Sequence, residues 1–251
     1  MSGHNKWSTI KRKKGAADAK RGAVFTKIIK EITVAARIGG SDPSGNPRLR
    51  IAINKAKESN MPNDNIERAI KKGTGDLEGV TYEEVRYEGY ASGGVAIMVD
   101  CLTDNRNRTT PEIRKIFSKC GGNMGESGSV AYMFDYKGMI IVEGGKVTED
   151  DIIELLIDFD IEDVKTEDGN ITITMPSESY SNVLDLLKSK NLNLVYNEVT
   201  YIPQTYVPLD EHKASQCMRL VAQLEDHDDV QNVYGNYDIA DDVMAKIGEE
   251  Q

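Results

Sequence analysis

Residues 138–202 constrain the fold most strongly, because their hydrophobic pattern predicts six elements in a recognisable order. The pattern predicts, in turn, a strand, a helix, two strands, a helix and a strand, over 138–143, 148–159, 161–167, 170–175, 177–189 and 193–202. The sequence Asp168-Gly169-Asn170 is a hairpin signal between the two consecutive strands. The order β-α-β-β-α-β is that of the ferredoxin-like fold, which closes its own sheet.

The segments on either side of this unit predict a second sheet. Strands are expected over 81–90 and 95–102, then a helix over 109–120, a glycine-rich connection over 121–128 and a strand near 130–134. Thr109 and Glu112 have the spacing of a capping box, and Pro111 suits a first helical turn. The final helix and strand, over 211–225 and 230–236, have no sheet of their own, so we expect them to return to this one.

The first 75 residues are helical in pattern. Apolar residues recur at helical spacing and predict a helix from Ala16 to about Ile38, ended by Gly39-Gly40. Asn46 and Pro47 suit the cap and first turn of a second helix over 47–59. A third helix is expected from Pro62 to Lys72, stopped by Gly73. We expect a polar, flexible arm over 1–15 before this bundle.

The predicted fold class is therefore α+β. It comprises an N-terminal three-helix bundle and two α/β domains, one of them ferredoxin-like and inserted into the other. The expected boundaries are 1–78 for the arm and bundle, 79–135 with 204–240 for the discontinuous domain, 136–203 for the inserted domain and 241–251 for a tail.

The net charge of −10 conceals a division along the chain. Residues 1–75 contain 17 lysines and arginines against 6 carboxylates, whereas the remainder contains 14 against 35. The first part has a net charge of +11 and the second −21. This asymmetry indicates a basic module for a polyanion and an acidic body that repels phosphate.

Several classes of protein are excluded by what the sequence lacks. No apolar run is long enough to span a membrane, and no apolar stretch follows the basic N-terminus as in a secretory signal. Three widely spaced cysteines and three histidines give no metal-ligand spacing, and no motif of a nucleophile with its base is present. Acidic pairs such as Asp228-Asp229 are interpreted as turn or surface residues. We expect a cytoplasmic protein with no catalytic residues, metal, cofactor, membrane contact or small-molecule substrate.

The basic N-terminal region contains the main candidate contacts for nucleic acid. Its cations can neutralise phosphates, and its tryptophan can stack on an exposed base. On the first helix, three lysines lie off the apolar stripe. Taken alone they would indicate a solvated helical face, but the net charge of +11 over residues 1–75 favours binding. The predicted nucleic-acid-binding residues here are Lys6, Trp7, Lys11, Arg12, Lys13, Lys14, Lys20, Arg21, Lys27 and Lys30.

Arg106 and Arg108 form a second, weaker candidate contact in the loop 103–109 before a helix. Arginines beside free helix amides can hold a phosphate, but a purely structural polar loop fits the spacing equally well. The glycine-rich segment 121–128 lacks the lysine of a phosphate loop and follows a helix, so it is interpreted as a flexible connection.

Several long motifs resemble one family. They are MSGHNKWSTIKRKKGAADAKRGAVFTKIIKEITVAAR, NPRLRIAINKAKESNMPNDNIERAIKKGTG, YEGYASGGVAIMVD, TDNRNRT and GGNMGESGSVAYMF. The chain resembles the YebC family over nearly its whole length, to about GNYDI. The resemblance implies three domains and no enzymatic activity. It also implies either a transcriptional regulator that binds promoter DNA or a translational activator that acts at the ribosome.

We therefore expect a nucleic-acid-binding regulator of gene expression, with a DNA-binding transcriptional regulator as the leading hypothesis. The first alternative is a ribosome-associated translation factor that binds ribosomal RNA. The second is a scaffold whose acidic domains bind a protein partner. No helix-turn-helix signature is evident, which favours contact with phosphates or structured RNA over base-specific reading of DNA.

Overall fold

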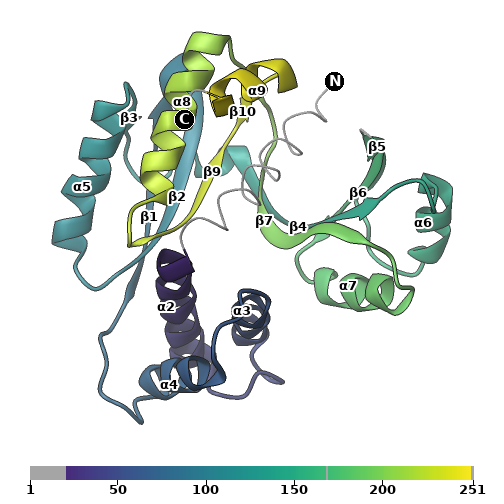
Figure 1. Ribbon diagram of the computed structural model, residues 1–251, viewed down its shortest axis with the longest axis horizontal. Coiled ribbons are helices and arrows are strands. Elements are labelled where there is room, and N and C mark those ends of the chain that lie inside the picture. The colour runs from purple at the N-terminus through teal and green to yellow at the C-terminus, as the bar shows by residue number, and fades with distance from the viewer. Residues whose placement is uncertain (1–20, 168, 250–251) are drawn as a thin grey trace. The chain divides into compact units, whose positions relative to one another are not determined.

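The computed structural model describes residues 21–167 and 169–249, and its elements have the predicted α+β class (Figure 1). Helices come first, followed by two four-stranded sheets and a two-stranded one. The described residues divide into two compact units, 21–129 with 215–233 and 130–214 with 234–249. The boundaries of the three domains expected from the sequence stay a prediction.

The N-terminal bundle consists of α2 (Arg21–Gly39), α3 (Pro47–Glu58) and α4 (Asn63–Thr74). Its core is apolar and includes Ile32 and Leu49, both fully buried. The predicted start of α3 is confirmed: the Asn46 side chain accepts a hydrogen bond from Leu49 N, and its amide donates to Ala35 O and Gly40 O. This one side chain therefore closes the loop between α2 and α3.

The prediction that Gly73 ends the third helix is wrong. The helix α4 continues to Thr74, and Gly75 forms the left-handed cap with φ 87°. A Cβ atom at Gly73 would clash with the carbonyl oxygen of Thr33. The glycine is needed because α4 approaches α2 closely at this point, which the sequence period alone does not reveal.

The first sheet has the strand order β3-β1-β2-β9. Its bounds are β1 Glu83–Ala91, β2 Val95–Thr103, β3 Asn123–Met124 and β9 Val230–Gly235. The antiparallel pair β1 and β2 turns through Ser92–Gly94, where Gly93 and Gly94 have positive φ. The position of β9 beside β2 confirms that the final strand returns to this sheet.

Two helices belong with this sheet, α5 (Arg106–Lys119) and α8 (Glu211–Glu225). The predicted capping box at Thr109 is wrong, because α5 begins earlier, with Asn105 as the cap that accepts from Arg108 N. Thr109 and Pro111 consequently lie inside the helix. Asn105, rather than Thr109, caps the helix because β2 ends at Thr103 and only two residues connect it to α5.

The glycine-rich segment 121–128 is more ordered than the expected flexible connection. Its residues Asn123–Met124 form β3, which pairs with β1, and Glu88 accepts hydrogen bonds from Gly125 N and Gly128 N. The strand predicted near 130–134 is also wrong. Ala131–Met133 is a 3₁₀ turn, and the strand begins only at Phe134.

The ferredoxin-like order is confirmed in the second sheet, whose strand order is β5-β6-β4-β7 with every neighbour antiparallel. Fully buried residues such as Ile140 and Ile173 make its core. The expected tail contains a further helix, α9. The remaining bounds are β4 Phe134–Glu143, α6 Glu149–Leu155, β5 Asp163–Glu167, β6 Asn170–Pro176, α7 Tyr180–Ser189, β7 Leu194–Pro203, β8 Val207–Pro208, β10 Tyr237–Asp238 and α9 Asp241–Glu249.

Candidate nucleic-acid interface

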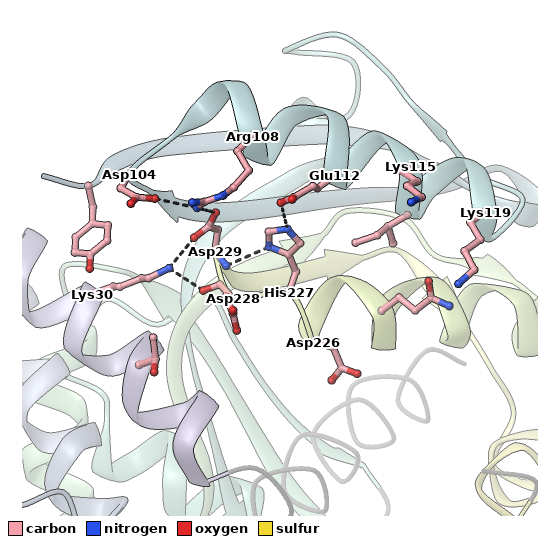
Figure 2. A pocket seen from close by; sticks show the side chains of 14 residues that line it. Lys30, Asp104, Arg108, Glu112, Lys115, Lys119, Asp226, His227, Asp228 and Asp229 are labelled. Atoms are coloured by element: carbon pink, nitrogen blue, oxygen red, sulfur yellow. Dashed lines mark hydrogen bonds and ion pairs between the residues drawn. The ribbon is translucent and has the colours of Figure 1, made fainter. Parts of the chain in front are cut away.

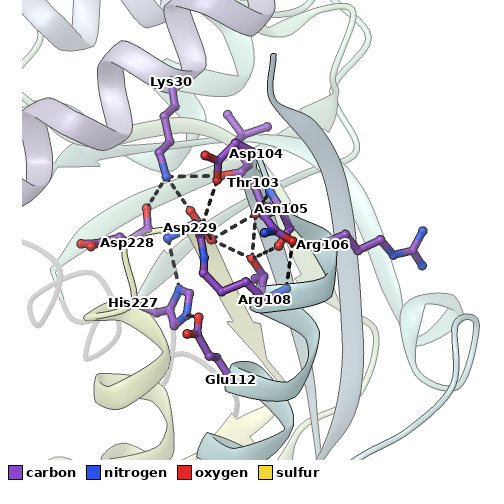
Figure 3. A network of polar contacts seen from close by, with 12 residues as sticks. Lys30, Thr103, Asp104, Asn105, Arg106, Arg108, Glu112, His227, Asp228 and Asp229 are labelled. Carbon is purple, nitrogen blue, oxygen red and sulfur yellow. Dashed lines mark hydrogen bonds and ion pairs between the residues drawn. The ribbon is translucent and has the colours of Figure 1, made fainter. Parts of the chain in front are cut away.

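A buried carboxylate at Asp229, just before β9, organises the polar contacts beside the bundle (Figure 3). Its Oδ1 atom accepts from Lys30 Nζ at 2.7 Å, and its Oδ2 atom accepts from Arg108 Nη2 at 2.8 Å. The hydroxyl oxygens of Thr109 and Thr103 lie 2.7 Å and 3.1 Å from Oδ2. One side chain thus connects α2, α5, β2 and the start of β9. Asp229 does lie in a turn, as predicted, but it is buried, so the interpretation of it as a surface residue is wrong.

Lys30 is fully occupied by this network. Its Nζ atom also donates to Asp228 O at 2.9 Å and to Leu102 O at 3.4 Å, and the residue is 7% exposed. An ammonium group has three protons, so no donor is left for a phosphate. The structure gives Lys30 the role of fastening α2 to the sheet.

Lys27 lies one turn before Lys30 on α2, and its side chain is likewise bonded within the fold. Its Nζ atom donates to Glu225 O at 2.6 Å. Burial lowers its pKa, and the nearby carboxylates of Glu225, Asp226 and Asp228 oppose that effect. Lys27 therefore reaches the end of α8, where carboxylates surround it.

The pKa of Asp229 lies well below the ordinary range of an aspartate. Burial alone would raise this pKa, but the hydrogen bonds from Lys30, Arg108 and Thr109 and the charge of Lys30 outweigh the effect of burial. The carboxylate is therefore ionised at neutral pH, as its two cationic partners require.

Arg106 and Arg108 have different surroundings although they are two residues apart. Both hydrogen bonds of Arg108 Nη2 go to carboxylates, Asp229 and Asp104, which raise the pKa of the guanidinium. Arg106 is exposed, points away from the network in Figure 3, and its guanidinium has no hydrogen bond or ion pair within the described residues. Arg108 holds the fold, and Arg106 is available to a ligand.

The bundle carries a second group of available cations. Four exposed residues of α3 and α4 have side chains that form no hydrogen bond or ion pair within the described part of the chain. They are Lys57, Arg68, Lys71 and Lys72. By contrast, Arg48 on α3 is held by Glu31 at 2.6 Å and by Glu84 at 2.7 Å.

Seven of the predicted contacts lie outside the described residues, and they stay predictions. These are Lys6, Trp7, Lys11, Arg12, Lys13, Lys14 and Lys20. Arg21 is the first residue of α2, and its side chain is also outside what the structure describes.

A groove of about 850 Å³ lies beside the Asp229 network, between α5 and the end of α8 (Figure 2). Lys115 and Lys119 of α5 line one wall, and Asp226 and Asp228 line the other. His227 bridges the two sides, since its Nε2 atom lies 3.0 Å from Glu112 Oε2. Sequence reasoning missed this groove, and the only signal for it was the excess of basic residues over 106–119.

Two structural findings bear on other classes of function. Within residues 21–167 and 169–249, no group of three or more histidine, cysteine or carboxylate side chains could hold a metal ion. No helix in that same part is both long enough and apolar enough to cross a membrane.

The fold and the interface define a class of α+β protein in which a basic helical bundle precedes a ferredoxin-like unit. Two family models match the sequence, described as the TACO1/YebC protein N-terminal domain over residues 5–76 and the TACO1/YebC second and third domain over residues 82–237. The chain belongs to the TACO1/YebC family.

Relatives match along nearly the whole chain. A protein of Trichlorobacter lovleyi is 57% identical over 247 residues, covering 98% of this chain and 100% of the relative. A protein of Desulfosudis oleivorans is 57% identical over 243 residues, covering 97% and 99%. Both are named "Probable transcriptional regulatory protein". The crystal structure of a conserved hypothetical protein from Aquifex aeolicus is similar, with a TM-score of 0.78 and 47% identity over 90% of this chain and 93% of that one.

The substitution Asp229→Asn should destabilise the protein by about 3–5 kcal/mol at pH 7, because it leaves Lys30 buried without a counter-charge. A lowered folded-state pKa stabilises the protein above the unfolded value of about 4, and this is lost as the pH falls towards the folded value. Urea unfolding from pH 7 to pH 3 should therefore show the difference from wild type shrinking below about pH 4. An equal difference at every pH would contradict the assignment.

Single substitutions should separate the two arginines of the loop. Arg108→Ala should lower stability by about 1 kcal/mol, since its ion pair with Asp229 is partly exposed. Arg106→Ala should change stability by less than about 0.5 kcal/mol, because its exposed guanidinium forms no hydrogen bond or ion pair within the described residues. Thermal unfolding of both variants tests this, and an equal loss in both would show that the loop is structural throughout.

Proposed function

We propose that this protein is a nucleic-acid-binding regulator of gene expression and that its basic N-terminal region makes the main contact. The observation that carries the proposal is the set of available cations on α3 and α4, within a region whose net charge is +11. Cations that lack carboxylate partners can neutralise phosphates and release counterions. The acidic remainder of the chain orients this region towards a polyanion.

The leading form of the proposal is a DNA-binding transcriptional regulator. The names of the relatives from Trichlorobacter lovleyi and Desulfosudis oleivorans support it. The alternative is a translation factor that binds ribosomal RNA. In its favour, three of the four available bundle cations are lysines, Lys57, Lys71 and Lys72, which act as point charges for phosphates. Only one of the four is an arginine, the residue that most commonly reads guanine edges.

The proposal includes a regulatory rather than an enzymatic role, in the cytoplasm. The properties of the cysteines support it. Burial raises the pKa of the Cys101 thiol to about 12, and the charges of Asp229 and Asp100 add to the effect. Cys120 and Cys217 are also buried. A buried, protonated thiol is a poor nucleophile.

The double substitution Lys11→Glu with Lys13→Glu should weaken binding to all nucleic-acid sequences and lower the salt dependence, with the slope of log K against log salt falling by about 2. Fluorescence anisotropy with labelled duplex DNA and RNA measures both quantities. A matched control is Lys188→Glu with Lys190→Glu at the end of α7, which makes the same change in net charge. If affinity and slope stay at the wild-type values, the arm makes no contact.

Sedimentation of the tagged protein in a sucrose gradient of cell lysate distinguishes the two forms of the proposal. A translation factor should migrate with ribosomes at low and moderate salt, and ribonuclease should abolish that migration. A DNA-binding regulator should be absent from the ribosomal fractions and should bind preferred promoters in a direct screen. Binding to neither ribosomes nor DNA would contradict both forms and favour a protein scaffold.

A further inference from the structure

Helix α5 carries an unusual concentration of positive charge. Of its 14 residues, five are lysine or arginine, whereas Glu112 is the single carboxylate. The chain after residue 75 contains only 14 basic residues against 35 acidic ones. More than a third of the cations in this acidic part of the protein therefore lie on one helix.

Most of these α5 cations are not used to hold the fold. The Glu112 carboxylate faces His227, and Arg108 is held by Asp104 and Asp229. The other four are exposed, and their side chains make no hydrogen bond or ion pair in the parts of the chain that the structure describes: Arg106, Arg114, Lys115 and Lys119. Basic residues elsewhere in the acidic part are commonly paired, as Lys137 is with Glu162 at 2.6 Å.

The geometry of α5 turns two of the available cations into the groove. The opposite face of the helix is buried through Thr109, Ile113 and Phe117. At 100° per residue, Lys115 and Lys119 lie on the same side as Arg108, about 6 Å apart along the axis. Both lysines line the groove beside Arg108 in Figure 2.

The two walls of this groove differ in chemistry. The lysines on α5 suit phosphates, whereas the Asp226 and Asp228 carboxylates line the other wall. Carboxylates accept hydrogen bonds from the amino groups of cytosine and adenine. An acidic protein segment would satisfy the lysines but would be repelled by these carboxylates. A nucleotide offers both phosphate and amino group, and its base edge is accessible where the strand is unpaired.

We propose that the groove between α5 and the end of α8 binds a single-stranded segment of nucleic acid, with phosphates on Lys115 and Lys119 and base amino groups towards Asp226 and Asp228. The inference rests on the proposed function and adds a second contact to the N-terminal one.

The test compares Lys115→Glu with Lys119→Glu in the full-length protein. The probes are a fluorescein-labelled single-stranded RNA of mixed sequence and a blunt RNA duplex of the same sequence. Affinity for the single strand should fall about tenfold or more and its salt slope by about 1.4, since each single-strand phosphate contact contributes about 0.7. Affinity for the duplex should change much less. Lys188→Glu with Lys190→Glu is the charge-matched control and should leave both affinities within about twofold of wild type.

Further outcomes separate this inference from the proposed function. If wild type binds both probes and the α5 variant matches the control, the groove is overturned and the N-terminal contact stands. If wild type binds neither probe nor duplex DNA, both proposals fail. If the α5 variant retains RNA affinity but loses binding to labelled polyglutamate that wild type shows, the groove takes an acidic protein segment instead. Because Lys119 lies in the last turn of α5, where a cation favours the helix, Lys115→Gln with Lys119→Gln should show a smaller loss of the same kind at an unchanged melting temperature.

Discussion

The ion pair between Lys30 and Asp229 is the interaction on which the packing of the N-terminal bundle against the first sheet depends. Isolated, either charge would be expensive to bury, and together they are stable only because every donor and acceptor finds a partner. Arg108, Thr103 and Thr109 complete that set around the carboxylate. The bundle is thereby held to the sheet by directional bonds, and the exposed cations of both are carried on one compact unit.

This arrangement divides the cations into two groups with different tasks. One group binds carboxylates and carbonyl oxygens within the fold and consists of Lys27, Lys30, Arg48 and Arg108. The exposed lysines of α4 and α5 have no such partners in the described residues. Counting charge in the sequence therefore overstates the number of groups that a polyanion can reach, and only the fold shows which ones remain.

Much of the architecture could be predicted from the sequence, because residues close together in the chain determine the secondary structure. The ferredoxin-like order follows from hydrophobic period, and the start of α3 follows from Asn46 with Pro47. The predictions were wrong where a residue's role depends on a partner far away in the sequence. Thr109 looks like a helix cap until its hydroxyl is seen beside Asp229, 120 residues away. Lys30 looks solvent-facing on a helical wheel because its counter-ion is 199 residues further along the chain.

The position of β9 has a consequence for the order in which the protein can be completed during synthesis. The ferredoxin-like sheet is built from the continuous stretch 134–203, so it can close as soon as that stretch has emerged. The first sheet gains its edge strand only when residues 230–235 arrive. Lys30 emerges from the ribosome early in synthesis, whereas its partner Asp229 emerges near the end of synthesis. Throughout that interval its charge is solvated, and the bundle relies on its own apolar core.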